Sequence, residues 1–136
     1  MPDVWVEKIH GPARRAIAKG LREANTRLYG KIDHKALTIT LRRRREIVGG
    51  LTGETYLCWL FVSWFWIDDA YRGAGHGTRM LKAAEDEARK RGAKNVYLDT
   101  FSFQAPKFYE KLGYREFGRL NEFPAGHHRS WMTKAL

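Results

Sequence analysis

Apolar and polar residues follow one another in two rhythms along this chain. Residues 4–9, 37–41 and 96–100 carry apolar side chains at every second position, which predicts half-buried strands. Residues 16–28 and 80–91 repeat apolar side chains at spacings of three and four, which predicts amphipathic helices. The two rhythms alternate, so the chain is expected to be an α/β protein.

The most apolar stretch, residues 56–67, is rich in aromatic and β-branched side chains and predicts a central strand buried on both faces. The helix at 80–91 and the strand at 96–100 follow it, so residues 59–101 predict a strand–helix–strand crossover between parallel strands. Three further elements complete the expected chain: a hairpin strand at 46–51, a short helix at 105–112, and final strands at 114–120 and 129–134. The expected order is β-α-β-β-β-α-β-α-β-β, a mixed sheet with helices, in one domain spanning residues 1–136.

A glycine-rich turn joins the central strand to the second helix. Gly73, Gly75 and Gly77 let the backbone turn tightly and approach a ligand, and the helix that follows directs its free N–H groups back at the turn. This arrangement predicts a pyrophosphate site. The spacing excludes a dinucleotide fingerprint, because Thr78 stands where a third glycine belongs, and it excludes a P-loop, because no lysine follows Gly77.

The composition excludes several classes of protein for this chain. With 43% hydrophobic residues the chain is not disordered, and no apolar run is long enough to cross a bilayer, so no membrane partner is expected. Cys58, the single cysteine, is expected in the core, and without an internal disulfide the expected location is cytoplasmic. The net charge of +10 permits nucleic acid, an acidic membrane surface or a polyanionic ligand such as coenzyme A. The four arginines at 42–45 fit a solvated hairpin tip, so nucleic-acid binding is not expected.

Two segments resemble signatures of a known family. Arg72, Gly75 and Gly77 form Arg-x-x-Gly-x-Gly, which resembles the acyl-CoA-binding motif of the GNAT superfamily of N-acetyltransferases. Residues 105–114 resemble the second GNAT signature, and residues 98–106 with 123–129 resemble segments of a bacterial single-domain subgroup. The resemblance covers roughly residues 4–134 and implies the GNAT fold, with acetyl-CoA as co-substrate and a primary amine as acceptor.

The resemblance also implies which residues hold acetyl-CoA. The expected contacts come from the end of the central strand, the glycine turn, the following strand end and the short helix: Phe65, Trp66, Ile67, Arg72, Gly73, Ala74, Gly75, His76, Gly77, Thr78, Ser102, Gln104, Phe108 and Tyr109. Many family members carry asparagine where this chain has Ser102, so the contact is expected to be shorter there or to come from Gln104.

Direct acetyl transfer needs a proton donor for the thiolate and a group that takes the amine's proton. Tyr109 is the expected general acid, because a phenol stays protonated at neutral pH. Asp99 is the tentative base, but the pattern leaves other candidates open: Asp68, Asp69, Glu54, His127 and His128. No cysteine, histidine and carboxylate spacing fits a metal, so none is expected.

The acceptor amine stays open at this level, whether small molecule or protein amino group. Trp64, Trp66, Tyr29 and Trp131 are candidates to line its cleft, and Arg22 and Asn25 are candidates to contact it. A non-catalytic acyl-CoA sensor and a basic nucleic-acid-binding protein are the alternatives to the enzyme. A homodimer formed through the last strands is compatible with the resemblance.

Overall fold

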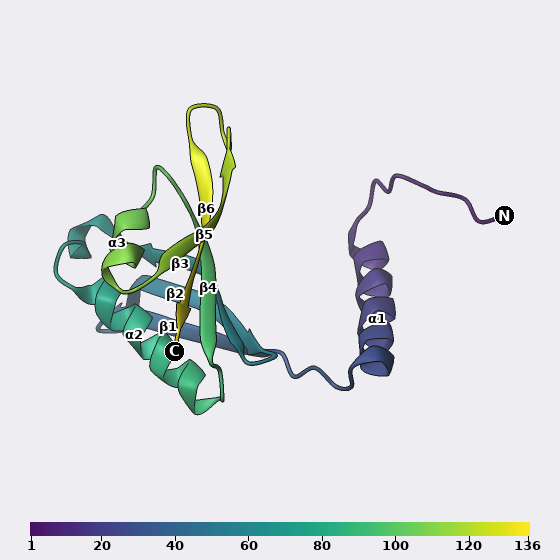
Figure 1. Cartoon of the computed structure of the whole chain (residues 1–136), viewed down its shortest axis with the longest axis horizontal. Helices are drawn as coiled ribbons and strands as arrows, with labels where there is room; N and C mark the ends of the chain where they lie inside the picture. Colours follow the sequence, from purple (N-terminus) through teal and green to yellow (C-terminus); the bar gives the residue numbers. More distant parts are fainter. The chain divides into compact units, whose positions relative to one another are not determined.

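A computed structural model describes residues 1–136, and the chain divides into two compact units, residues 1–32 and residues 33–136 (Figure 1). The first unit holds helix α1 (Gly11–Leu28). The second holds a six-stranded sheet with helices α2 and α3. The expectation of a single domain spanning residues 1–136 stays a prediction.

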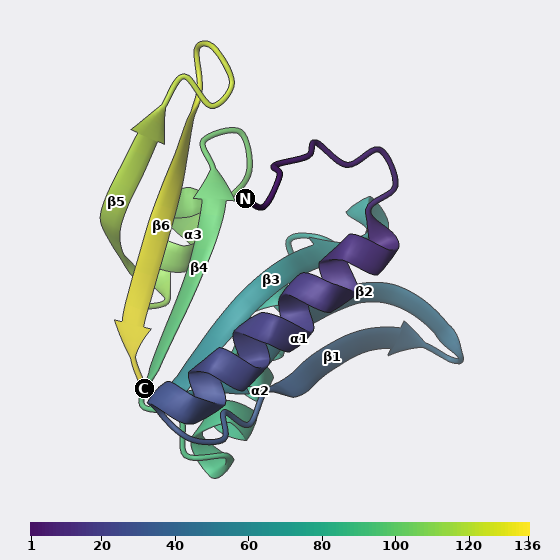
Figure 2. The ribbon, with the colours of Figure 1, turned by 90° about the vertical axis from the view of Figure 1, so that its right-hand side faces the viewer.

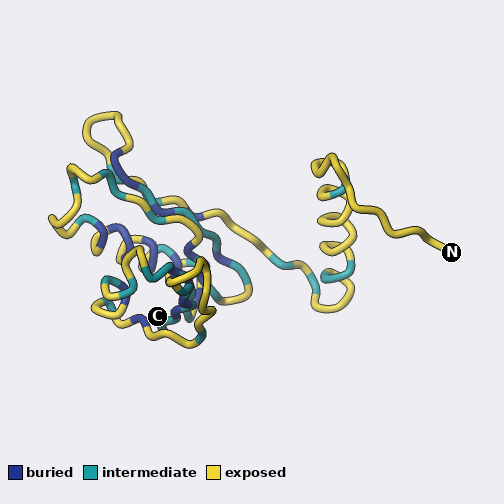
Figure 3. Tube along the Cα trace, turned by 90° about the horizontal axis from the view of Figure 1, so that it is seen from above, coloured by how far each residue is buried: buried dark blue, intermediate teal, exposed yellow.

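The N-terminal unit corrects the expected first strand. Residues 4–9 form no strand, and Val4 and Val6 are 98% and 96% exposed. A strand is stabilised by backbone pairing with a neighbour, and no strand of the structure pairs with this segment. The helix expected after it is confirmed, with Pro12 in its first turn, but it buries no residue (Figure 3). Alternation alone was therefore insufficient to fix a strand here.

The second unit is a mixed sheet in the order β1-β2-β3-β4-β6-β5. Only β3 and β4 run parallel, and α2 connects them, which confirms the expected crossover. The other neighbours pair antiparallel. The strands are β1 (Lys35–Arg43), β2 (Glu46–Tyr56), β3 (Trp59–Ile67), β4 (Asn95–Phe101), β5 (Arg115–Asn121) and β6 (His128–Ala135).

Helix α2 (His76–Lys90) supplies the helical side of the core. Leu81, Ala84 and Ala88 are at most 1% exposed and pack with Leu60 and Val96 of the sheet. Their spacing of three and four places them on one helical stripe, while acidic and basic residues take the solvent side. Helix α3 (Pro106–Lys111) begins at its proline and ends before Gly113, as expected. Phe108 of α3 packs edge-on against Phe65 of β3, with the ring centroids 6.0 Å apart.

The expected central strand is wrong in two respects. It begins at Trp59, because Leu57 and Cys58 form a tight turn with positive φ angles of 47° and 68°, and this turn leaves Cys58 exposed instead of in the core. It is also buried on one face only, since Trp64 and Trp66 are 76% and 50% exposed. Aromatic density therefore indicated a strand correctly but not the burial of both faces.

The arginine-rich connection is a solvated hairpin tip, as expected. Arg44 and Arg45 make the turn between β1 and β2 and are exposed.

None of the helices combines the length and the apolar character that a bilayer crossing requires.

Candidate active site

Strands β3 and β4 separate part-way along their length, and this split organises the site. They pair from Trp59 opposite Asn95 to Val62 opposite Leu98, after which each continues unpaired with the other (Figure 2). The register between β2 and β3 shifts at the same level, between Thr52 and Gly53. The unpaired ends, residues 63–67 and 99–101, therefore offer backbone groups to a ligand lying between them.

The glycine loop begins where β3 ends. Arg72 donates from Nε to the carbonyl oxygen of Ile67 at 2.9 Å and pairs through Nη1 with Asp69 at 3.2 Å, so its side chain closes the loop. Gly73 and Gly75 have φ angles of +77° and +81° with open space around them. These positions need glycine for backbone conformation, since other residues rarely adopt such angles.

Helix α2 starts within this loop and presents free donors. Its first backbone bond runs from the Arg79 N–H to the Gly75 carbonyl at 3.2 Å, so the N–H groups of His76, Gly77 and Thr78 come before the helical ladder. Gly77 is buried, and a Cβ there would lie 3.2 Å from Phe108 Cζ and 3.3 Å from Ile67 Cδ1. Donors at a helix N-terminus, held in a tight cradle, fit the pyrophosphate of coenzyme A.

Tyr109 projects from α3 into the aromatic packing beside the split. Its ring centroid lies 6.5 Å from that of Phe65 on β3 and 5.2 Å from that of Phe108. The side chain is 8% exposed, and burial, followed by the negative charge of Asp99, raises the pKa of Tyr109 to about 12. The phenol therefore stays protonated through the neutral range, as a proton donor must.

Asp99 is the first residue of β4 beyond its last pair with β3. Its Oδ1 accepts a hydrogen bond from Nε of Arg129 on β6 at 2.7 Å, and it forms an ion pair with Nη2 of the same side chain at 2.6 Å. The Asp99 side chain is 17% exposed and that of Arg129 is 28% exposed. The negative charge of Asp99 contributes to the raised pKa of Tyr109, so the expected acid and the tentative base interact electrostatically.

Ser102 and Gln104 brace the loop after β4. Ser102 Oγ lies 3.0 Å from His127 Nδ1 and accepts from the His128 N–H at 3.1 Å, and Gln104 Oε1 accepts from the Phe101 N–H at 2.9 Å. Both side chains thus hold neighbouring backbone in place. Their contact with coenzyme A stays a prediction.

The other candidate bases are engaged elsewhere in the unit. Asp68 caps the short 3-10 helix Asp69–Tyr71 by accepting from the Ala70 N–H at 3.0 Å, and Asp69 pairs with Arg72. Glu54 lies 3.5 Å from His34.

The candidate residues for the acceptor cleft are divided between the two units. Trp64 and Trp66 lie on the exposed side of β3, while Tyr29, Arg22 and Asn25 belong to the N-terminal unit. No cluster of three histidine, cysteine or acidic side chains could hold a metal ion.

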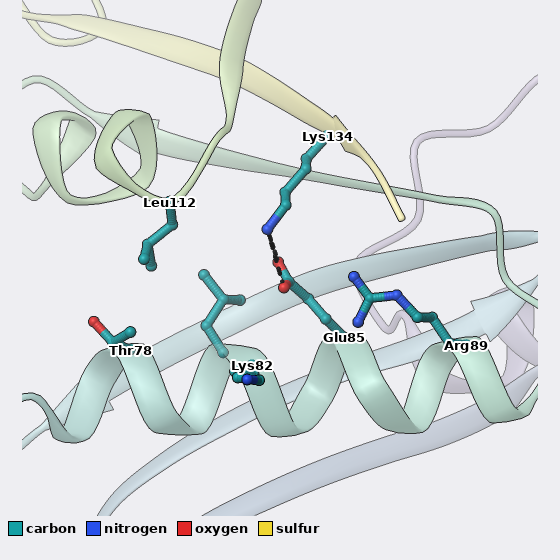
Figure 4. Close-up of a pocket in the computed structure, with 7 residues that line it drawn as sticks. Thr78, Lys82, Glu85, Arg89, Leu112 and Lys134 are labelled. Carbon is teal, nitrogen blue, oxygen red and sulfur yellow. Dashed lines mark hydrogen bonds and ion pairs between the residues drawn. The ribbon is translucent and has the colours of Figure 1, made fainter.

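The sequence reasoning missed a buried charge cluster between α2 and β6. Glu85, 5% exposed, accepts from the Tyr114 hydroxyl at 2.6 Å and from Lys134 Nζ at 3.1 Å (Figure 4). It lines a cavity of about 250 Å³ that also includes Thr78 and Leu112. Glu85 lies four residues after Leu81 and three before Ala88, and this position on the buried stripe of α2 is the signal by which the sequence could have indicated its burial.

Comparison with known proteins identifies the family. Residues 9–114 match the Acetyltransferase (GNAT) family. The chain belongs to the GNAT acetyltransferase family. It is 36% identical over 123 residues to an acetyltransferase from Agrobacterium fabrum, covering 90% of each chain. It is 37% identical over 100 residues to blasticidin-S acetyltransferase from Streptomyces morookaense, covering 73% of this chain and 74% of that protein.

A solved structure supports the same assignment. The crystal structure of an acetyltransferase from Agrobacterium tumefaciens is 34% identical and superposes with a TM-score of 0.92 over 100% of both chains. This GNAT chain is therefore an enzyme, an N-acetyltransferase whose co-substrate is acetyl-CoA. The resemblance drawn from Arg72–Gly77 and residues 105–114 is confirmed, and with it the fold.

Proposed function

We propose that this GNAT enzyme transfers the acetyl group directly from acetyl-CoA to a primary amine within the β3–β4 split. The observation that carries the proposal is the convergence of three features at that split. They are the free N–H groups that begin α2, the buried Tyr109 and the half-buried Asp99. Together they supply a phosphate cradle, a proton donor and a proton acceptor.

The phosphate cradle and the unpaired end of β3 would hold acetyl-CoA. The N–H groups of residues 73–78 are suited to the pyrophosphate, and backbone groups near Phe65, Trp66 and Ile67 are suited to the acetyl-pantetheine. Backbone donors are aimed before the substrate arrives, so little ordering is needed on binding. Arg72 contributes by closing the loop on Ile67.

The proton steps are assigned to Tyr109 and Asp99. The amine nitrogen attacks the thioester carbonyl and its proton passes to Asp99, directly or through water, and the thiolate sulfur that departs takes a proton from the Tyr109 hydroxyl. The raised pKa of Tyr109 keeps this proton available. Asp99 Oδ2 has no hydrogen-bond partner within the protein and is therefore able to accept.

A thiol-release assay with acetyl-CoA and a panel of amines tests this function. Release that depends on both substrates, with the acetylated amine found by mass spectrometry, is the expected result. Thiol release without an acetylated product would contradict direct transfer. Similarity to blasticidin-S acetyltransferase favours a small-molecule acceptor, so small amines precede peptides in the panel.

Two further properties belong to the proposal. A homodimer through the last strands is supported by the exposed apolar side chains Phe117 and Leu120 of β5, which lies at the edge of the sheet, and light scattering after gel filtration would measure twice the chain mass of 15.8 kDa. A reducing, cytoplasmic location is supported by the lone exposed Cys58. Nucleic-acid binding is not part of the proposal, because Arg44 and Arg45 lie on a solvated turn.

A further inference from the structure

Arg129 makes more contacts at the split than the proposed reaction uses. Its guanidinium carbon lies 5.0 Å from the ring centroid of Phe101, 5.2 Å from that of Phe123 and 4.9 Å from that of Trp131. The same guanidinium forms one hydrogen bond and one ion-pair contact with a single oxygen of Asp99. One side chain therefore joins a carboxylate to three aromatic rings from β4, β6 and the connection between β5 and β6.

The strand register explains how these groups meet. On β4 and β6, Phe101 lies opposite Arg129 and Asp99 lies opposite Trp131, so all four side chains fall on the same face of the sheet. The alternate residues Leu98, Thr100, Ser130 and Met132 face the other way and are buried. Arg129 thus belongs to the face opposite the core, next to the separated strand ends.

Arg129 supplies the positive charge that contacts Asp99. The two side chains form an ion pair, β3 carries no charged residue, and His127 is hydrogen-bonded to Ser102. The negative charge of Asp99 also contributes to the raised pKa of Tyr109. An unpaired carboxylate here would hold an incoming amine as its ammonium, a form that cannot attack, whereas a paired carboxylate does so less strongly.

We propose that Arg129 is a positioning residue for the acceptor. It fixes Asp99 by one oxygen, leaves the other for the amine, and offsets the carboxylate charge so that the amine can lose its proton. By gathering Phe101, Phe123 and Trp131 it also builds an apolar wall, which assigns as acceptors primary amines carried on a flat, apolar group. This inference rests on the proposed transfer function.

Two probe amines test the substrate class. The wild-type enzyme is expected to show a KM for 2-phenylethylamine about tenfold or more below that for ethanolamine, since an apolar ring gains from the aromatic wall and a hydroxyl does not. Equal KM values, or turnover of ethanolamine alone, would overturn the class. Failure to acetylate either amine, or any other in a broad panel, would overturn the transfer function itself.

Substitutions at Arg129 test the positioning role. Arg129→Gln is expected to raise the KM for 2-phenylethylamine about tenfold, because the three rings and Asp99 lose the side chain that holds them together, and to leave the KM for acetyl-CoA within about twofold. Arg129→Lys retains the charge and should return the KM for 2-phenylethylamine toward the wild-type value.

The control is Arg119→Gln, which removes an ion pair with Glu116 on β5 and should leave both KM values unchanged. Circular dichroism confirms that each variant is folded. A lower kcat for Arg129→Gln with an unchanged KM for 2-phenylethylamine would contradict the positioning role. If Arg129→Gln does not fold, Arg129→Lys decides, because a KM for 2-phenylethylamine about tenfold above that of the wild-type enzyme would contradict the charge argument.

Discussion

Tyr109 combines a proton-donating hydroxyl with a buried ring next to Phe65 of β3. Its ring packs against Phe65 and Phe108, and these contacts do not depend on the hydroxyl. The phenol contributes a proton and the ring contributes packing. The two contributions can therefore be separated by removing one atom.

Tyr109→Phe is expected to lower kcat about 10²–10⁴-fold, the usual contribution of one positioned proton donor, while the KM for acetyl-CoA changes little. Steady-state kinetics at saturating amine measure both parameters. Tyr97→Phe is the matched control, because it removes a hydroxyl bonded to Tyr56 at 2.6 Å outside the split. Equal losses in the two variants would argue against the acid role.

At Gly75 the backbone conformation requires glycine, whereas the space around the residue would admit a side chain. Gly75→Ala meets no neighbouring atom, but its φ of +81° is strained for alanine, at a cost of about 1 kcal/mol. We expect weaker acetyl-CoA binding, measured by calorimetry, because relief of the strain would turn the α2 donors away. Gly20→Ala in α1, also in open space and without a positive φ, should leave binding unchanged. Unaltered binding by Gly75→Ala would show that the loop tolerates the strain.

At the scale of elements, the split depends on how β3 departs from its neighbours. The register of β2 against β3 shifts beside Gly53, at the level where pairing of β3 with β4 ends. A Cβ at Gly53 would collide with the carbonyl oxygen of Phe61, a backbone atom that cannot swing aside. A bulge bends its strand, so this irregularity directs the end of β3 away from β4.

Gly53→Ala is therefore expected to destabilise the fold by about 3 kcal/mol or more, as a backbone collision within a buried strand must shift the bulge. The midpoint of urea unfolding reports the change. Gly118→Ala on β5 provides the control, since its Cβ would meet nothing within 4 Å. If both variants unfold at the same midpoint, the collision is relieved at little cost, and the bulge does not determine the geometry of the split.

The sequence predicted those elements whose signal is local. The α2 stripe, the glycine turn and α3 with Pro106 and Gly113 were all readable from spacing, and the family signatures fixed their order. The Asp99–Arg129 pair could not be predicted, because it depends on the β4–β6 register between residues 30 positions apart. The strand expected at residues 4–9 failed for a related reason, since pairing is a property of two segments.

At the scale of the whole molecule, three phenols share one response to pH. Burial raises the pKa of Tyr109 to about 12, and burial together with hydrogen bonds raises the pKa values of Tyr97 and Tyr114 as well. In each case the folded state holds its proton above the ordinary value near 10. At these three phenols the folded protein and the unfolded chain therefore differ in bound protons only in alkaline solution.

The sign of the pH effect follows from these raised values. Below pH 10 the folded protein and the unfolded chain both keep the phenol protons, so the full stabilisation is present. Above pH 10 the unfolded chain loses its phenol protons first. The free energy of unfolding therefore falls until the pH passes the pKa of the folded state. For Tyr109 alone, a shift of about two units amounts to about 3 kcal/mol. Urea unfolding between pH 8 and pH 12 should show constant stability followed by a decline beginning near pH 10. Tyr109→Phe should make that decline shallower, whereas a decline of unchanged steepness would mean that Tyr109 titrates alike in the folded and unfolded states.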